Sequence, residues 1–353
     1  MLHSALLAQS MDRSEIEDWL LRGGADHMVT GGGMTILEAS LADEASTLRR
    51  SKEYLSVFKR LFNLGSPVAG PQGPPISTKR RCLINILLEA NADDALILEI
   101  LDAGADVNDR GGNTERHTTP LQQAIDRGRL NLAAELIRRG ANVCAPPGED
   151  CYGYHYTALQ KACAANAPLP FIRQLVEAGA DVNEPPPARG PGLTSLQCAA
   201  RLGLLNMAQY LLEQGARINS LGSPRGCDPC TRNPARIRRT RPLDWAACDG
   251  RLDMVSFLLE SGGRSGRPGK TGLDGAIDAA VVRNHFAVAI VLQEWATKNA
   301  SSILEEEAAW QRENPHEAGQ LLEVWCEDDI SETGDSTSSE DSEDCSETDE
   351  TLA

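Results

Sequence analysis

The nine residues LDAGADVND, at positions 101–109, return with few changes as VEAGADVNE at 176–184, and weaker copies read IRRGANV at 137–143 and LEQGARIN at 212–219. Each copy ends an apolar pattern of helical spacing with a glycine, which is a common way for a helix to stop. The equivalent glycines lie 36 to 47 residues apart: Gly24, Gly65, Gly104, Gly140, Gly179, Gly215 and Gly262. A period in this range predicts a stacked repeat.

Residues 119–143, TPLQQAIDRGRLNLAAELIRRGANV, show how one unit is built. Thr119 is a suitable N-cap, and Pro120 suits the first helical position, where its missing N–H needs no partner. Apolar residues then recur at helical spacing on both sides of a turn at Gly128: Leu121, Ala124, Ile125, Leu132, Leu136 and Ile137. The glycines that end second helices, among them Gly104, Gly140, Gly179 and Gly215, are predicted to take a left-handed backbone conformation.

Two helices of seven to ten residues cannot bury both of their apolar faces alone, so each unit needs a neighbour on either side. The aromatic content is only 4%, which favours a core of aliphatic side chains between regular elements. The sequence therefore predicts an all-α solenoid of about eight helix-turn-helix repeats over residues 1–300.

The pattern resembles the ankyrin repeat, whose first helix begins T-P-L-H-x-A and whose second helix ends G-A-D-V-N. The matching first-helix stretches are TPLQQA (119–124), TALQKA (157–162), TSLQCA (194–199), RPLDWA (241–246) and TGLDGA (271–276). Units in that family run near 33 residues, and the extra length here follows the Gly-Ala pairs, where the family places finger-like loops. The resemblance implies a fold and a protein-binding role, and it implies no chemistry.

The last helix of the predicted array has an apolar outer face that another segment must cover. Residues 286–295, FAVAIVLQEW, are apolar on nearly every side, whereas a terminal repeat needs a polar outer face. We expect residues 301–326 to supply one or two capping helices. The alternative is a free amphipathic helix that awaits a partner.

No motif predicts catalysis, a cofactor or a metal. GGRSGRPGKTG (262–272) nearly matches a phosphate-binding loop, but Arg264 replaces its first glycine and the stretch follows a helix rather than a strand. A nucleotide-binding enzyme is therefore the least favoured reading. CDPC (227–230) is a single C-x-x-C pair, and the nearest other thiols, Cys198 and Cys248, are expected to be buried packing residues.

Two long fingers are the predicted binding surfaces. The first carries Tyr152, Tyr154 and Tyr156, which alternate as on one side of a strand and serve either as interface anchors or as packing against a neighbouring finger. The second, 217–241, holds seven arginines and one acid. Its candidate contact residues are Arg225, Arg232, Arg236, Arg238 and Arg239.

The C-terminal segment 327–353 has 12 Asp and Glu and no Lys or Arg. With almost no hydrophobic residues it is predicted to be disordered. Thr337, Ser338 and Ser346 each precede an acid by three residues and are candidate phosphorylation sites for acidophilic kinases. A salt-sensitive contact between this tail and the arginine finger is a hypothesis, and a purely solubilising tail is its alternative.

The leading functional prediction is a non-enzymatic scaffold or adaptor that binds a partner protein through a concave face and the fingers. The alternative is a nuclear transcription coregulator, because the irregular repeats and acidic tail are similar to those of filamentous-fungal ankyrin proteins. The net charge of −17 argues against general nucleic-acid binding, and no small-molecule substrate is expected. The start lacks a secretory signal and no 18-residue apolar run exists, so we expect a cytoplasmic or nuclear protein without a membrane anchor.

Overall fold

The computed structural model describes residues 58–59, 62–63, 68, 82–110, 118–146, 156–186, 192–222, 240–265 and 273–313. Over these residues the regular structure is entirely helical, with no strand. The helices are α5 (Leu83–Glu89), α6 (Asp94–Asp102), α7 (Pro120–Asp126), α8 (Leu130–Arg138), α9 (Ala158–Ala164), α10 (Leu169–Glu177), α11 (Ser195–Leu202), α12 (Leu205–Glu213), α13 (Pro242–Cys248), α14 (Leu252–Glu260), α15 (Asp274–Val282) and α16 (Phe286–Glu313).

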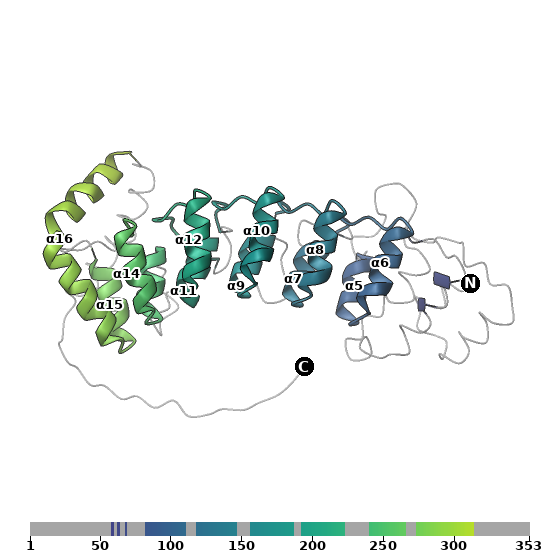
Figure 1. Cartoon of the computed structure of the whole chain (residues 1–353), viewed down its shortest axis with the longest axis horizontal. Helices are drawn as coiled ribbons and strands as arrows, with labels where there is room; N and C mark the ends of the chain where they lie inside the picture. Colours follow the sequence, from purple (N-terminus) through teal and green to yellow (C-terminus); the bar gives the residue numbers. More distant parts are fainter. Residues whose placement is uncertain are drawn as a thin grey trace, which may run out of the picture. The chain divides into compact units, whose positions relative to one another are not determined.

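These helices form successive pairs in single file within the unit formed by residues 1–307 (Figure 1). First helices pack on first helices along the series α5, α7, α9, α11, α13 and α15, and second helices pack on second helices from α8 to α14. The predicted all-α solenoid is confirmed. The first two of the eight predicted repeats lie almost wholly outside the described residues.

Each pair begins and ends as its residues dictate. Thr119 caps α7 by accepting a hydrogen bond from the Gln122 N–H, and the Gln122 side chain accepts one from the Thr119 N–H in return. The same reciprocal box starts α9 and α11. At the other end, Gly140 takes a φ of +86°, which only glycine adopts without strain.

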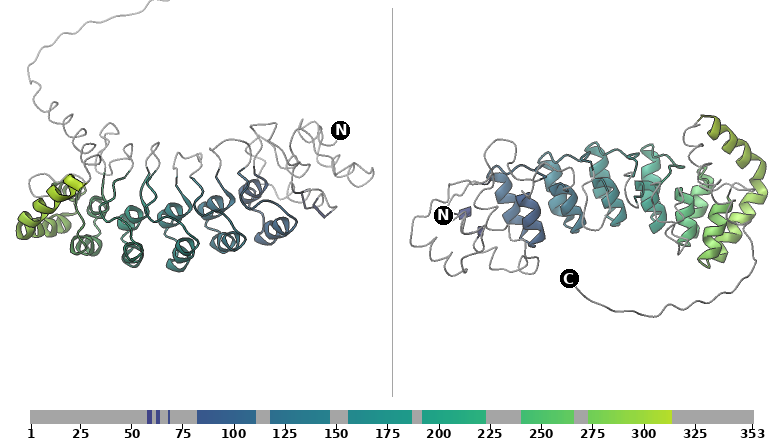
Figure 2. Two further views of the ribbon diagram at one scale, coloured as in Figure 1. Left: turned by 90° about the horizontal axis from the view of Figure 1, so that it is seen from above. Right: turned by 180° about the vertical axis from the view of Figure 1, so that it is seen from behind.

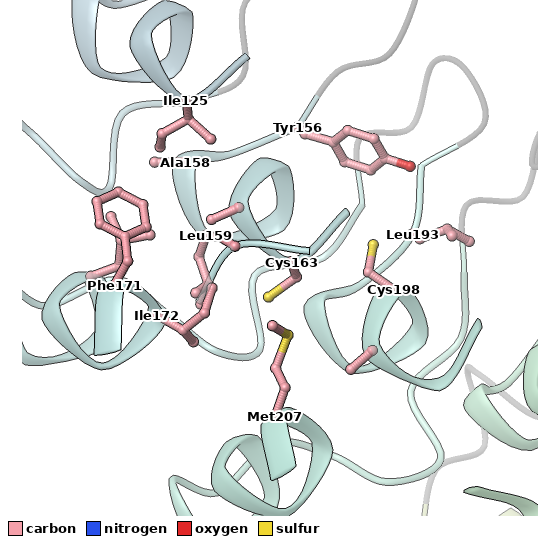
Figure 3. Packing of buried hydrophobic residues seen from close by; sticks show 14 of the residues in the cluster. Ile125, Tyr156, Ala158, Leu159, Cys163, Phe171, Ile172, Leu193, Cys198 and Met207 are labelled. Carbon is pink, nitrogen blue, oxygen red and sulfur yellow. The ribbon is translucent and has the colours of Figure 1, made fainter. Parts of the chain in front are cut away.

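One continuous apolar core runs through the stack. Leu121, Leu136 and Leu211 are fully buried, and the cluster to which they belong extends from α5 to α16. Figure 3 shows the central part, where Ile172 of α10 and Met207 of α12 approach the first helices α9 and α11. Because each pair buries its sides against two neighbours, no pair has a core of its own.

The connecting segments leave the helices on a common side, as their described parts show in the left view of Figure 2. We call each segment between one pair and the next a finger. The paired helices have seven to nine residues in α5 to α15. Variation in repeat length therefore falls mainly in the fingers.

The last helix departs from the expected layout. α16 has 28 residues and continues through residue 300, where the sequence analysis placed the end of the array. Its inner side is buried through Val288, Leu292 and Ala296, whereas Phe286 and Ile290 are more than half exposed. The capping role predicted for residues 301–326 stays a prediction, since residues 314–326 lie outside the described range.

Candidate protein-interaction surface

In three consecutive repeats, a buried glutamine of the first helix holds the base of the finger that follows. Gln122 Nε2 donates to the carbonyl oxygens of Ala145 and Pro146 at 3.1 and 3.2 Å. Gln160 Nε2 donates to the Glu184 carbonyl at 2.9 Å. Both glutamines are fully buried, so these bonds replace water that the side chains have lost.

Gln197 does the same at the longest finger and closes both of its ends. Its Nε2 donates to the Ser220 carbonyl at 3.1 Å and to the Thr240 carbonyl at 2.7 Å. The Gly222 N–H also donates to the Thr240 carbonyl at 3.0 Å. The two ends of the finger are therefore held together at 220–222 and 240.

The next pair builds the same base from different residues. Arg241 and Asp244 stand where the three preceding repeats have Thr and Gln. Asp244 Oδ2 accepts from the Arg241 N–H at 2.8 Å, and its Oδ1 accepts from the Ser265 hydroxyl at 2.6 Å. The Arg241 guanidinium donates to the Ser265 carbonyl at 3.1 Å and is fully buried. Arg241 therefore belongs to the core, and counting it with the exposed basic finger is wrong.

A second set of bonds joins the fingers of neighbouring repeats. Asn108 Nδ2 donates to the Gly140 carbonyl at 3.1 Å, and its Oδ1 accepts from the Asn142 N–H at 2.7 Å. Asn183 bridges to Gly215 and Arg217 in the same way, at 2.9 and 2.8 Å. A third bridge runs from Asn219 to Gly262 and Arg264. We call this series the asparagine ladder.

One rung of the ladder differs. Cys144 occupies the asparagine position, and its thiol donates to the Gly179 carbonyl at 3.0 Å. A thiol has one weak donor and no amide oxygen to accept a second bond. This rung is therefore weaker than its three counterparts.

At the opposite edge of the array, where each first helix turns into the second, two of the turns are closely packed at their glycines. A Cβ placed on Gly203 would lie 2.9 Å from Arg251 Cδ, and one on Gly250 would lie 2.6 Å from His285 Nδ1. Arg251 and His285, which directly precede α14 and α16, thus lie on the turn of the preceding repeat. We call this side the turn edge.

Ion pairs between neighbouring repeats hold the first half of the array. Lys161 Nζ lies 2.6 Å from Asp126 Oδ2, and the lysine side chain is only 3% exposed. Arg139 pairs with Asp102 of the preceding repeat at 2.6 Å. A lysine so deeply buried needs its carboxylate partner, since leaving the charge unpaired is costly.

The buried thiols of the central repeats have the properties of packing residues. Burial raises the pKa of Cys163 above its usual value, and it raises that of Cys198 to about 12. A thiol with a raised pKa carries little thiolate at neutral pH and is a poor nucleophile. Cys198 and Cys248 are both fully buried in α11 and α13, as the sequence predicted.

Most residues singled out from the sequence as partner contacts lie outside the described residues. These are Tyr152, Tyr154, Arg225, Arg232, Arg236, Arg238 and Arg239, together with the phosphorylation candidates Thr337, Ser338 and Ser346. Tyr156 is described: it is only 9% exposed and joins the core, so its ring is not available as an exposed anchor. Gly104, Gly140, Gly179 and Gly215 have φ between +86° and +100°.

The glutamine bases and the asparagine ladder were not recognised in the sequence. Their signal was present, because Gln recurs at 122, 160 and 197 in the fourth place of the first-helix motif. Asn recurs likewise four residues after Gly104, Gly179 and Gly215. A recurring polar residue inside an otherwise apolar motif indicates a bond that every repeat must make.

No group of three or more His, Cys, Asp or Glu in the described part of the chain is placed to hold a metal ion. The glycine-rich stretch at 262–272 begins after α14, with Gly262 in the left-handed region, and its residues 266–272 lie outside the description. None of the described helices is both long and apolar enough to cross a membrane.

Known proteins share this repeat pattern. A family model for ankyrin repeats in three copies matches residues 147–222. The putative palmitoyltransferase ZDHHC13 of Danio rerio is 26% identical over 205 residues, which is 58% of this chain and 27% of that protein. The ankyrin repeat domain-containing protein M-T5 of Myxoma virus (strain Lausanne) is 32% identical over 164 residues, 44% of this chain and 32% of that protein.

The human ASB11 ankyrin repeat domain, in its crystal structure, has 23% identity and a TM-score of 0.44, covering 59% of this chain and 82% of that one. The chain matches about a third or less of the length of the two curated relatives. The recurring motifs, the stacked helix pairs and the family model lead to one conclusion: the chain contains ankyrin repeats, which are modules for protein–protein interaction.

Proposed function

We propose that this protein is a non-enzymatic scaffold or adaptor that binds a partner protein through its concave face and its long fingers. The observation that supports this most is the double fixing of the finger bases. Buried glutamines tie three of the bases to their own repeats, and the asparagine ladder ties neighbouring bases to one another. A surface held in this way loses little conformational entropy when a partner binds.

The finger at 223–239 is the first place to test the proposal. It contains the arginines 225, 232, 236, 238 and 239, and its two ends are bonded to Gln197 through Ser220 and Thr240. Replacing residues 223–239 with a Gly/Ser loop of the same length removes the side chains and keeps the base. The matched control replaces 187–191, a shorter finger segment, in the same manner.

We expect the tagged full chain to retain a specific partner protein from native lysate, identified by mass spectrometry and then confirmed with both components purified. The 223–239 exchange should lower the affinity for that partner at least tenfold, with no change in melting temperature. The 187–191 exchange should have a smaller effect. If neither the 223–239 replacement nor the 187–191 replacement alters the affinity for the partner, the fingers are not the binding surface.

A further inference from the structure

We propose that three arginines on the turn edge, Arg201, Arg251 and Arg283, form a binding site for an acidic peptide segment. We call them the arginine strip. The inference rests on the proposed function and assigns it a second surface, away from the fingers, together with the chemistry of the ligand. The strip lies entirely within the described residues of the last three helix pairs.

Contacts between successive repeats place these side chains next to one another. Arg251 Nε donates to the Arg201 carbonyl at 3.2 Å, and its methylene groups lie on Gly203. Arg283 reaches back in the same direction, and its Nη2 lies 3.9 Å from Asp249 Oδ1. Arg251 and Arg283 therefore lie against the end of the preceding first helix, whereas Arg201 belongs to the end of α11 itself, so that the three come from successive repeats.

Arg201 is fixed by an aromatic ring. Its guanidinium lies over Trp245, 5.8 Å from the ring centroid, and Trp245 is only 7% exposed. A guanidinium over an indole face is attracted by the ring quadrupole, and this contact does not use its N–H donors. The strip is preorganised by contacts that leave its hydrogen-bonding capacity largely unused.

The charges of the strip are poorly compensated in comparison with those of Lys161 and Arg139. Lys161 and Arg139 each have a carboxylate oxygen at 2.6 Å. In the described part of the chain, no carboxylate lies within ion-pair distance of Arg201 or Arg251, and Arg283 has only the 3.9 Å contact to Asp249. A protein with a net charge of −17 thus keeps a local excess of positive charge here.

Carboxylates suit this arrangement best. Guanidinium groups bind carboxylates through paired N–H donors, and three of them one repeat apart match side chains along an extended peptide. Arg251 is exposed, and the Arg283 side chain is 49% exposed, so both can be reached without opening the fold. Three cations are too few to hold a nucleic acid against the negative charge of the whole chain.

The test uses a fluorescent peptide with the sequence of residues 327–353 and Ser in place of Cys345, which carries 12 acidic residues and no Lys or Arg. The receptor is the full chain with the Asp and Glu of its own 327–353 changed to amides, so that no acidic tail competes. Binding is followed by anisotropy at low and at physiological salt. We expect R201Q/R251Q to weaken binding about tenfold, with the effect shrinking as salt is added.

The matched control is R127Q/R138Q, which removes two exposed arginines from the first half of the array and changes the net charge equally. It should change the affinity less than twofold. In case R201Q/R251Q unfolds, amide hydrogen exchange of the receptor with its natural arginines gives a second readout. Bound peptide should slow exchange at 201–205 and 249–253. An equal effect of both double variants, or no protection at these two turns, overturns the proposal.

Further arms settle the ligand and its source. A peptide with every acid changed to its amide should not bind, and tighter binding of a DNA duplex than of the acidic peptide would overturn the assignment. Weaker peptide binding by the chain with its natural tail than by the amide-tail chain identifies the tail as a source of the ligand. Partner capture that depends on 223–239 but not on the strip would contradict this inference and leave the proposed function standing.

Discussion

Two glycines with the same left-handed backbone conformation differ in how much space surrounds them. Gly140 and Gly250 have φ of +86° and +69°, yet a Cβ on Gly140 would meet nothing within 4 Å, whereas one on Gly250 would lie 2.6 Å from His285. Backbone strain acts at both positions, but steric conflict acts only at Gly250. The comparison separates the cost of the conformation from the cost of close packing.

Replacing Gly140 with Ala should lower the free energy of unfolding by about 1 kcal/mol, the cost of the left-handed conformation. Gly250→Ala should cost roughly 1–3 kcal/mol more, because the imidazole of His285 must move. Urea denaturation of both variants measures the difference. Equal losses would show that His285 does not press on the turn.

Cys144 is the weak rung of the asparagine ladder and offers a stabilising substitution. Asparagine at this position should donate to the Gly179 carbonyl and accept from the next finger, as Asn108 and Asn183 do. We expect Cys144→Asn to raise the free energy of unfolding by about 0.5–1.5 kcal/mol. Cys144→Ser is the control, because a hydroxyl is too short to span both groups. A destabilised Asn variant, measured by denaturation, would contradict the interpretation of the ladder.

At the scale of the helix and its finger, a single buried amide connects two structures. Gln197 holds α11 to both ends of the 220–240 finger. Its removal takes one donor from each of two carbonyl groups at partly buried positions, and of these the Ser220 carbonyl loses the glutamine donor while the Thr240 carbonyl keeps its bond from the Gly222 N–H. Losing a partly buried bond costs more than losing an exposed one.

Gln197→Ala should lower the free energy of unfolding by about 1–3 kcal/mol and speed hydrogen exchange of the Gly222 N–H. Gln209→Ala is the matched control, since Gln209 is exposed and bonds only Glu213 within α12. It should cost less than about 0.5 kcal/mol. The free energy of unfolding and the Gly222 amide exchange rate are measured on both variants. If Gln197→Ala lowers stability but leaves the Gly222 exchange rate unchanged, Gln197 only caps its helix and does not hold the finger.

The helices themselves were predictable because periodicity, caps and glycines agree on them. Thr119, Pro120 and Gly140 mark the ends of α7 and α8 in the sequence, and the structure places them there. The burial of Arg241 was not predictable from charge alone. It depends on Asp244 and Ser265, which become its neighbours only through the finger.

The length of α16 was underestimated for a different reason. Between Ala296 and Glu313 no glycine or proline interrupts the chain, so nothing there stops a helix. The apolar pattern ends near residue 296, and the prediction followed the pattern rather than the missing stop signal. The arginine strip was missed as well, because its members lie 32 to 50 residues apart and meet only when repeats stack.

At the scale of the whole molecule, the stack joins its parts only through neighbours. Figure 1 shows the helix pairs in file, and the contacts link each first helix to the ones before and after it. In such an array, stability is the sum of repeat terms and interface terms, so damage should spread to adjoining repeats before distant ones. In a protein with a single globular core, a cavity at one position would instead lower the stability of all elements alike.

The most direct test of this account is hydrogen exchange across the whole chain in two cavity variants, Leu211→Ala in α12 and Leu292→Ala in α16, both at fully buried positions. Each should cost about 2–5 kcal/mol locally. We predict that Leu211→Ala lowers protection in α11, α12 and the adjoining pairs, and that Leu292→Ala lowers it only from α13 onward. In both variants α5 to α8 should exchange as in the natural protein. Loss of protection in α5 to α8 equal to that at the substituted pair would contradict a stack of neighbours.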